Sequence, residues 1–162
     1  MCGILGELSL KNQLTSQKNF ADLLALSKHR GPDATHIEKG KNYQLGFNRL
    51  ALLDLSEAGQ QPKKSPSSRY HLVFNGEVYN YKELAEKYKL TNLRSTSDTE
   101  VILHLFDQLG VVETLKELNG MFAIAVIDNE TSKLYLSRDF AGIKPLFYGY
   151  NSSGIVFASQ FD

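Results

Sequence analysis

The sequence is poor in cysteine and histidine and has no excess of charge of either sign. Its 162 residues include a single cysteine, which excludes a disulfide within the chain and fits a reducing compartment. Four scattered histidines offer no spacing typical of a metal site, so we expect no bound metal. Eighteen basic and eighteen acidic residues cancel, and no basic block stands out. Nucleic acid and anionic membranes are therefore not expected as partners.

Long hydrophobic runs are also missing. No apolar stretch approaches the roughly 20 residues that a membrane-spanning helix needs. The N-terminus has neither the charged region nor the apolar region of a signal peptide. Apolar residues make up 42% of the chain and charged residues 22%, as in an ordinary globular protein of one domain. We therefore expect a soluble, cytoplasmic protein.

Periodic apolar positions and turn residues predict a mixture of strands and helices. Strands are expected at 4–10, 34–38, 43–52 and 70–74, and helices at 15–28 and 79–88. A third helix is expected from a capping box at 97–100 to Gly110. The last third of the chain predicts four strands in an antiparallel meander, at 121–127, 133–137, 145–150 and 154–158. Two layers of strands with helices outside them would bury this much apolar sequence.

The single cysteine stands at position 2, where removal of the initiator methionine would make it the N-terminal residue. A thiol is a strong nucleophile, and a free α-amine titrates at about 7.7 to 8.0, close to the pH at which a general base works best. An N-terminal cysteine would therefore carry its own base, as N-terminal threonine nucleophiles do. If Met1 stays attached, the amine is an amide and the base is lost. A lone cysteine near a terminus can equally be an accident of composition, so Cys2 needs support from the rest of the chain.

Four short segments follow one another along the chain: Met1-Cys2-Gly3-Ile4, His29-Arg30-Gly31-Pro32-Asp33, Phe74-Asn75-Gly76-Glu77 and Ser97-Asp98-Thr99-Glu100. Together with further matches such as Gly142-Ile143-Lys144-Pro145-Leu146, they resemble the class II glutamine amidotransferase domain, most closely the glutaminase domain of asparagine synthetase. The resemblance covers essentially the whole chain, residues 1–162. It implies an α+β fold, a four-layer αββα sandwich of two antiparallel sheets of the N-terminal-nucleophile hydrolase type.

The resemblance also implies a reaction, the hydrolysis of glutamine to glutamate and ammonia. Cys2 would attack the side-chain amide and form a γ-glutamyl thioester, while its own amine accepts and returns the proton. Asn75 and Gly76 would form the oxyanion hole with a side-chain amide and a backbone N–H. From the residues alone, Asn-Gly is also the commonest tight hairpin turn, and that alternative stays open.

The same resemblance assigns residues to the binding of the amino-acid substrate. Arg49 would bind the α-carboxylate, although it can also be a solvated strand arginine. Asp98, helped by Glu77, would bind the α-ammonium, although an acid in the first turn of a helix also complements the helix dipole. The main chain at Leu50 and Leu53 would line the pocket.

Two further residues lie in the segment at 29–33. The resemblance places Arg30 near the nucleophile, where a positioning role is expected rather than a chemical one. His29 has the chemistry of a general base, but the N-terminal amine makes such a base unnecessary. A structural role is therefore preferred for His29.

Asparagine synthetases continue into a second domain that adenylates aspartate with ATP, and this sequence contains no phosphate loop of that kind. We therefore expect no cofactor in this chain, and ATP and magnesium only in an associated synthetase domain. The glutaminase domain of that family usually runs further, and three explanations stay open: an excised domain, a shortened natural chain that works with a separate synthetase, or a remnant that no longer catalyses. The main hypothesis is a glutaminase that supplies ammonia to a synthetase domain or subunit. The alternative is a non-catalytic module that binds glutamine or a protein and has kept the fold.

Overall fold

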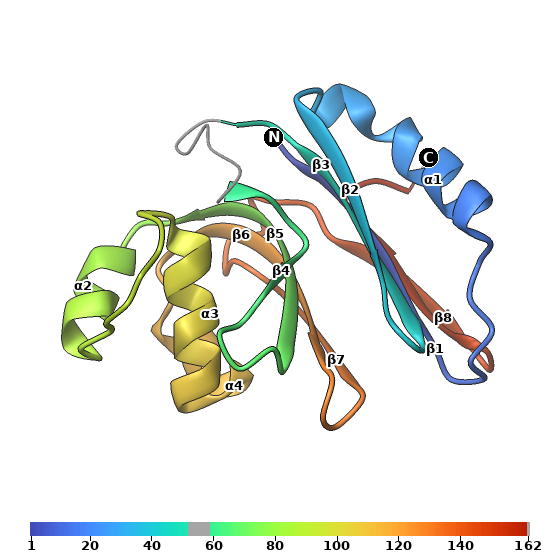
Figure 1. Ribbon diagram of the computed structural model, residues 1–162. Helices are drawn as coiled ribbons and strands as arrows, with labels where there is room; N and C mark the ends of the chain where they lie inside the picture. The colour runs from blue at the N-terminus through green and yellow to red at the C-terminus, as the bar shows by residue number, and fades with distance from the viewer. Residues whose placement is uncertain (52–58, 162) are drawn as a thin grey trace.

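Two antiparallel β-sheets lie face to face in the computed structural model, which describes residues 1–51 and 59–161 (Figure 1). The strand orders are β2-β3-β1-β9-β8 in one sheet and β4-β5-β6-β7 in the other. The strands of the first sheet are β1 (Gly3–Ser9), β2 (Ala34–Lys39), β3 (Tyr43–Arg49), β8 (Phe147–Asn151) and β9 (Gly154–Ala158). The strands of the second sheet are β4 (Lys63–Lys64), β5 (Tyr70–Val78), β6 (Gly120–Asp128) and β7 (Lys133–Arg138).

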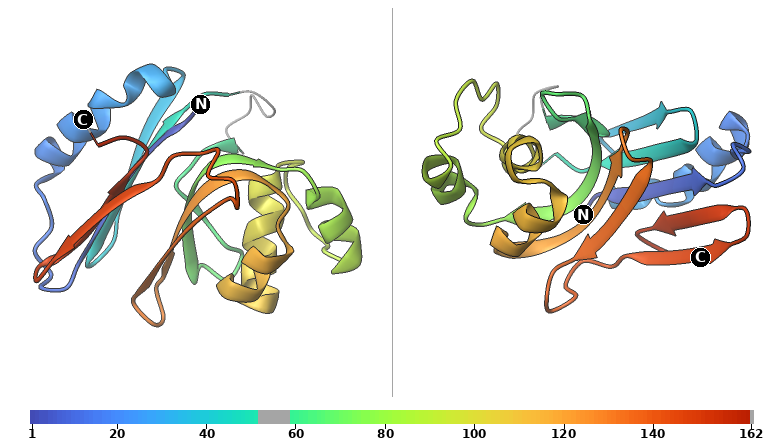
Figure 2. Two further views of the ribbon diagram at one scale, coloured as in Figure 1. Left: turned by 180° about the vertical axis from the view of Figure 1, so that it is seen from behind. Right: turned by 90° about the horizontal axis from the view of Figure 1, so that it is seen from below.

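Helices cover the outer face of each sheet and complete four layers (Figure 2). Helix α1 (Gln17–Leu26) and a short 3₁₀ turn, η1 (Lys28–Arg30), belong to the first sheet's side. The helices on the second sheet's side are α2 (Tyr81–Lys87), α3 (Asp98–Leu109) and α4 (Val111–Glu117). The predicted αββα sandwich of the α+β class is therefore confirmed. No helix in the described part of the chain is long and apolar enough to cross a membrane.

The core between the sheets follows the two-residue period of the strands. In β1, Ile4 and Leu8 are buried between the sheets, where they join Leu45 and Phe47 of β3. The second sheet contributes Val73, Ala123, Ala125 and Ile127 to the same cluster. The other faces of β5 and β6 form a second cluster with α3, made by Leu72, Phe74, Ile124, Val126, Ile102, Leu103 and Phe106. Both faces of these two strands are therefore buried, which explains why they read as continuous apolar runs.

Helix α3 begins and ends where the sequence predicts. The side chain of Ser97 accepts a hydrogen bond from the backbone N–H of Glu100 at 3.3 Å, and Gly110 ends the helix with a φ of 79°. The Glu100 carboxylate does not complete the predicted capping box. It accepts hydrogen bonds from the backbone N–H of Arg94 and from the hydroxyl of Ser95 instead.

The predicted antiparallel meander in the last third of the chain is wrong. Strands β6 and β7 pair in the second sheet, whereas β8 and β9 pair in the first. The chain changes sheets between Arg138 and Phe147. Turn residues in a sequence mark a reversal, but they do not say which sheet edge the next strand joins. That choice is made by long-range pairing, here of β9 with β1.

Strand β5 is longer than predicted and settles one open alternative. It continues through Asn75 and Gly76, which pair with Ala123 and Phe122 of β6. Asn75-Gly76 is therefore part of a strand, and the hairpin-turn alternative is excluded. Strand β4 and helix α4 are absent from the sequence-based prediction, because one has only two residues and the other follows α3 directly after Gly110.

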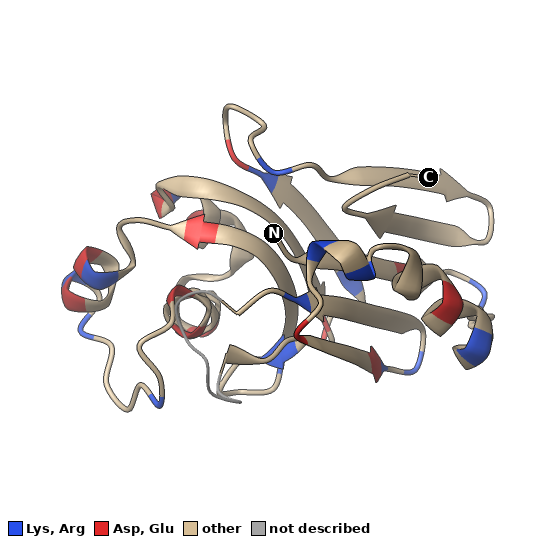
Figure 3. Ribbon diagram, turned by 90° about the horizontal axis from the view of Figure 1, so that it is seen from above, with Lys and Arg blue, Asp and Glu red and all other residues tan. Residues whose placement is uncertain are grey.

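Charged residues of the two signs are interspersed in the view from above (Figure 3). Arg69, for example, pairs with Asp128 at 2.8 Å and with Glu130 at 3.1 Å. In this view the described residues form no block of one sign that would favour a polyanionic partner.

Candidate active site

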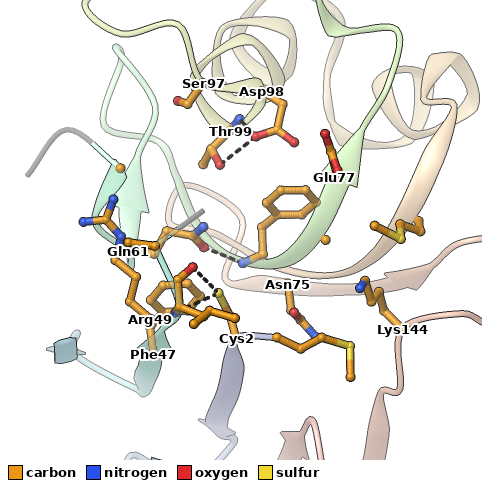
Figure 4. Close-up of a pocket in the computed structure, with 17 residues that line it drawn as sticks. Cys2, Phe47, Arg49, Gln61, Asn75, Glu77, Ser97, Asp98, Thr99 and Lys144 are labelled. Carbon is orange, nitrogen blue, oxygen red and sulfur yellow. Dashed lines mark hydrogen bonds between the residues drawn. The ribbon is translucent and has the colours of Figure 1, made fainter. Parts of the chain in front are cut away.

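A cavity of about 260 Å³ lies where β1 begins, β3 ends and α3 begins, beside the second half of β5 (Figure 4). It brings together residues from both sheets that are far apart in the sequence. The predicted site residues that line it are Cys2, Arg49, Leu50, Asn75, Gly76, Glu77 and Asp98. Leu53 lies outside the described residues. Arg30 is not among the lining residues, but it contacts the main chain of Cys2.

Cys2 contacts two other segments, and the strand that follows it is held by a third. The backbone N–H of Leu50 donates to Sγ at 3.4 Å, and the thiol donates to the carbonyl oxygen of Leu50 at 3.7 Å. Nε of Arg30 donates to the carbonyl oxygen of Cys2 at 3.3 Å. This contact is compatible with the positioning role expected for Arg30. Two residues later, Ile4 donates to the hydroxyl of Ser159 at 3.0 Å. The thiol therefore stands at a fixed end of the central strand of its sheet.

The electrostatic surroundings keep the thiol protonated. Burial is the largest influence and raises the pKa of Cys2. The hydrogen bond from Leu50 and the positive charges of the N-terminal amine, Arg49 and Lys144 lower the pKa but do not cancel the effect of burial. Since the thiolate is the nucleophile, a group that removes the proton is needed for reaction near neutral pH.

Two acidic residues line the cavity on the side of the second sheet. Asp98, at the start of α3, accepts hydrogen bonds from the backbone N–H of Val78 at 2.9 Å and of Thr99 at 2.7 Å. Burial raises the pKa of Asp98 first, these hydrogen bonds lower it, and the charge of Glu77 raises it further, so the net shift is upward. Asp98 therefore joins α3 to the end of β5 and also faces the cavity, so both roles considered for it are compatible with its position.

Arg49 ends β3 and reaches the same cavity from the other sheet. It is 8% exposed, so the alternative of a solvated strand arginine is wrong. One guanidinium and two carboxylates thus line a single cavity with the thiol.

Asn75 and Gly76 of β5 line the cavity, and Asn75 lies on the side of Cys2 (Figure 4). The Nδ2 atom of Asn75 is buried and has no hydrogen-bond partner among the residues that the structure describes. A side chain at position 76 would place its Cβ 2.1 Å from the carbonyl oxygen of Met121, so only glycine permits the close approach of β6. The orphan amide donor is the feature that a ligand oxygen would satisfy.

Sequence reasoning assigned no role to two other residues of the cavity. Gln61 is 6% exposed, and its Oε1 accepts a hydrogen bond from the backbone N–H of Phe74 at 2.6 Å. Lys144 reaches the cavity from the segment between β7 and β8. Lys144 belongs to a segment that carries the family resemblance, Gly142-Ile143-Lys144-Pro145-Leu146, but no spacing rule connects Lys144 or Gln61 to position 2. Among the described residues, no three His, Cys, Asp or Glu side chains are grouped so that they could hold a metal ion.

The αββα sandwich, with a thiol directly ahead of its central strand, is a fold of the N-terminal-nucleophile hydrolase type. Cys2 lines one cavity with Arg49, Glu77 and Asp98. The chain belongs to the glutamine amidotransferase domain family, whose model matches residues 1–162. The resemblance inferred from the short segments is therefore confirmed.

Individual relatives agree with this assignment. The chain is 42% identical over 166 residues to a probable asparagine synthetase (glutamine-hydrolyzing) of Acanthamoeba polyphaga mimivirus, covering 99% of this chain and 30% of that protein. It is 36% identical over 178 residues to a putative asparagine synthetase (glutamine-hydrolyzing) of Methanocaldococcus jannaschii, covering 99% of this chain and 34% of that protein. The chain thus spans about a third of the length of these curated relatives.

A solved structure shares the fold. Glutamine phosphoribosylpyrophosphate amidotransferase from B. subtilis superposes with a TM-score of 0.79 at 21% identity, covering 98% of this chain and 42% of that chain. At this identity the likeness extends to the sandwich of two sheets and its helices, not to the substrate.

Proposed function

We propose that this domain hydrolyses glutamine to glutamate and ammonia, with Cys2 as the nucleophile. The observation that carries the proposal is the cavity in which the thiol, an arginine and two carboxylates converge. The chain's membership of the glutamine amidotransferase domain family supports the choice of glutamine over other amino acids.

The cavity is complementary to a zwitterionic amino acid. Arg49 would bind the α-carboxylate, because a guanidinium presents two parallel donors to a carboxylate. Asp98 and Glu77 would bind the α-ammonium from the side of the second sheet. The side-chain amide would then extend toward Cys2 and Asn75.

The chemistry requires removal of Met1, so that Cys2 has a free α-amine. This amine takes the thiol proton as sulfur attacks the amide carbon, and the carbonyl oxygen becomes an oxyanion. The unpartnered Nδ2 of Asn75 would donate to that oxyanion. The amine returns its proton to the leaving nitrogen, the C–N bond breaks, and ammonia departs from a γ-glutamyl thioester. A water, deprotonated by the same amine, then attacks the thioester and releases glutamate and the thiol.

We propose further that the ammonia serves an ATP-dependent amide-forming domain or partner of the asparagine synthetase kind. The relatives that support this are named asparagine synthetases, and each is about three times as long as the part that this chain matches. ATP and magnesium would act in that domain or partner, and no cofactor is proposed for this chain. The transfer of ammonia to that domain or partner would be a separate step that follows the hydrolysis of glutamine.

Replacing Arg49 with alanine tests the proposed binding mode. We expect KM for glutamine to rise about 10- to 100-fold with a much smaller change in kcat, because a charge-assisted bond made in both ground and transition states is lost. Glutamate release at a series of glutamine concentrations measures both constants. Arg94→Ala is the matched control, since Arg94 is exposed and does not line the cavity. An unchanged KM in Arg49→Ala would remove Arg49 from the substrate site.

A further inference from the structure

Lys144 is a buried cation in the active-site cavity for which the reaction outlined above has no use. It is 7% exposed and lines the same cavity as Cys2 and Asn75 (Figure 4). Among the described residues, the Nζ atom of Lys144 is not one of the buried side-chain atoms that lack a hydrogen-bond partner, so the ammonium is open to the cavity although most of the side chain is buried. A lysine can bury its aliphatic stem and keep its charged end in an open space, and here that space is the cavity that Cys2 lines. A negative charge that forms in this cavity would therefore be attracted by the ammonium of Lys144.

The main chain at Lys144 is fixed by one buried carboxylate. The buried carboxylate of Asp139 accepts hydrogen bonds from the backbone N–H of Lys144 at 3.1 Å and of Ile143 at 2.8 Å. The same carboxylate accepts from the backbone N–H of Phe122 at 3.1 Å, and Phe122 pairs with Gly76 of β5. Asp139 thus ties the segment that carries Lys144 to the strand pair that carries Asn75.

The other charged side chains around the thiol already have a proposed role or a hydrogen-bond partner, or carry a negative charge. Arg49 of β3 is assigned to the substrate carboxylate, and Arg30 of η1 donates to the carbonyl oxygen of Cys2. Glu77 of β5 and Asp98 of α3 are negative and oppose charge on sulfur. Of the lysines and arginines that line the described part of the cavity, Lys144 alone has no assignment.

We propose that Lys144 is an electrostatic residue of the site, whose ammonium stabilises negative charge first on Cys2 sulfur and then on the oxyanion beside Asn75. The proposal rests on the proposed function for the second of these charges but not for the first. Burial raises the pKa of the thiol, and the charge of Lys144 acts in the opposite direction, behind Leu50, the N-terminal amine and Arg49. The field of a cation in a partly water-excluded cavity is stronger than in bulk water.

The single cysteine gives a direct test on the intact chain. Because Cys2 is the only thiol, the pH dependence of alkylation by iodoacetamide reports its ionisation alone. Lys144→Met, which keeps the length of the side chain, is expected to raise the apparent pKa of the thiol by about half a unit to one unit. Lys144→Arg is expected to keep the wild-type profile. Lys133→Met is the matched control, because Lys133 is exposed at the start of β7 and does not line the cavity.

The alkylation profiles of these variants separate an effect of the charge of Lys144 from an effect of its packing. An unshifted profile in Lys144→Met, or an equal shift in Lys144→Arg, overturns the proposal. Lys144→Gln provides the same comparison if the methionine variant does not fold. Alkylation needs no turnover, so an inactive domain that shows the expected shift would contradict the proposed function and leave the role of Lys144 at the sulfur intact.

The affinities of glutamate and glutamine test the proposed role of Lys144 at the oxyanion beside Asn75. Glutamate carries a γ-carboxylate where the oxyanion of the reaction would form, whereas glutamine is neutral there. In a Cys2→Ala background, Lys144→Met is expected to weaken glutamate binding about three- to tenfold and to change glutamine binding much less. Equal changes for the two ligands would overturn the role at the oxyanion, while loss of both ligands from Cys2→Ala itself would contradict the proposed function.

Discussion

Cys2→Ala is expected to lower kcat for glutamate release at least about 10⁴-fold, because it removes the atom that bonds to the substrate. Glutamine affinity should change little, since Arg49, Glu77 and Asp98 remain in the cavity. The rate of glutamate release gives kcat, and equilibrium binding of glutamine to the same preparation gives the affinity.

Ser159→Ala is the control for a mere loss of local structure. Its hydroxyl accepts from the backbone N–H of Ile4 at 3.0 Å, two residues after the nucleophile, but it does not line the cavity. We expect this variant to lose some stability and to keep most of its activity. Glutamate release by Cys2→Ala at the wild-type rate would rule out Cys2 as the nucleophile.

Asn75→Ala is expected to lower kcat about 100- to 1000-fold with little change in KM. The reason is that its Nδ2, which is buried and unpartnered within the described structure, would gain a hydrogen bond only when the oxyanion forms. Asn75→Asp should be at least as damaging, because a carboxylate would face the developing negative charge.

Asn80→Ala provides a comparison on the same stretch of chain. The side chain of Asn80 donates to the carbonyl oxygen of Glu117 at 2.9 Å and accepts from the backbone N–H of Asn119 at 3.0 Å, outside the cavity. Its replacement should affect stability rather than kcat. If Asn75→Ala raised KM and left kcat unchanged, Asn75 would belong to ground-state binding and not to the oxyanion hole.

The sequence predicts much of the fold, because its signals are local. The serine at position 97 and the glycine at position 110 define α3 through contacts within a few residues. Sheet membership was not predictable in the same way. Strands β7 and β8 follow each other in the chain but join different sheets, and only the pairing of β9 with the distant β1 decides this.

The candidate site was predictable where a residue type and a known motif coincide. Cys2 is conspicuous because it is the only thiol and stands at position 2, and the resemblance added Arg49 and Asp98. Lys144 stands in a segment that carries the resemblance, but the segment assigned it no role, and a lysine in a turn is usually solvated. Its burial depends on the carboxylate of Asp139 holding the turn against β6, a tertiary effect that a residue pattern does not contain.

The most direct test of the proposed chemistry is the intact mass of the chain quenched during turnover with glutamine. A chain that begins at Cys2 and carries one γ-glutamyl group on that residue is the predicted result. Turnover without any such adduct on Cys2, or turnover by a chain that keeps Met1, would contradict a mechanism in which one residue supplies both the nucleophile and its base.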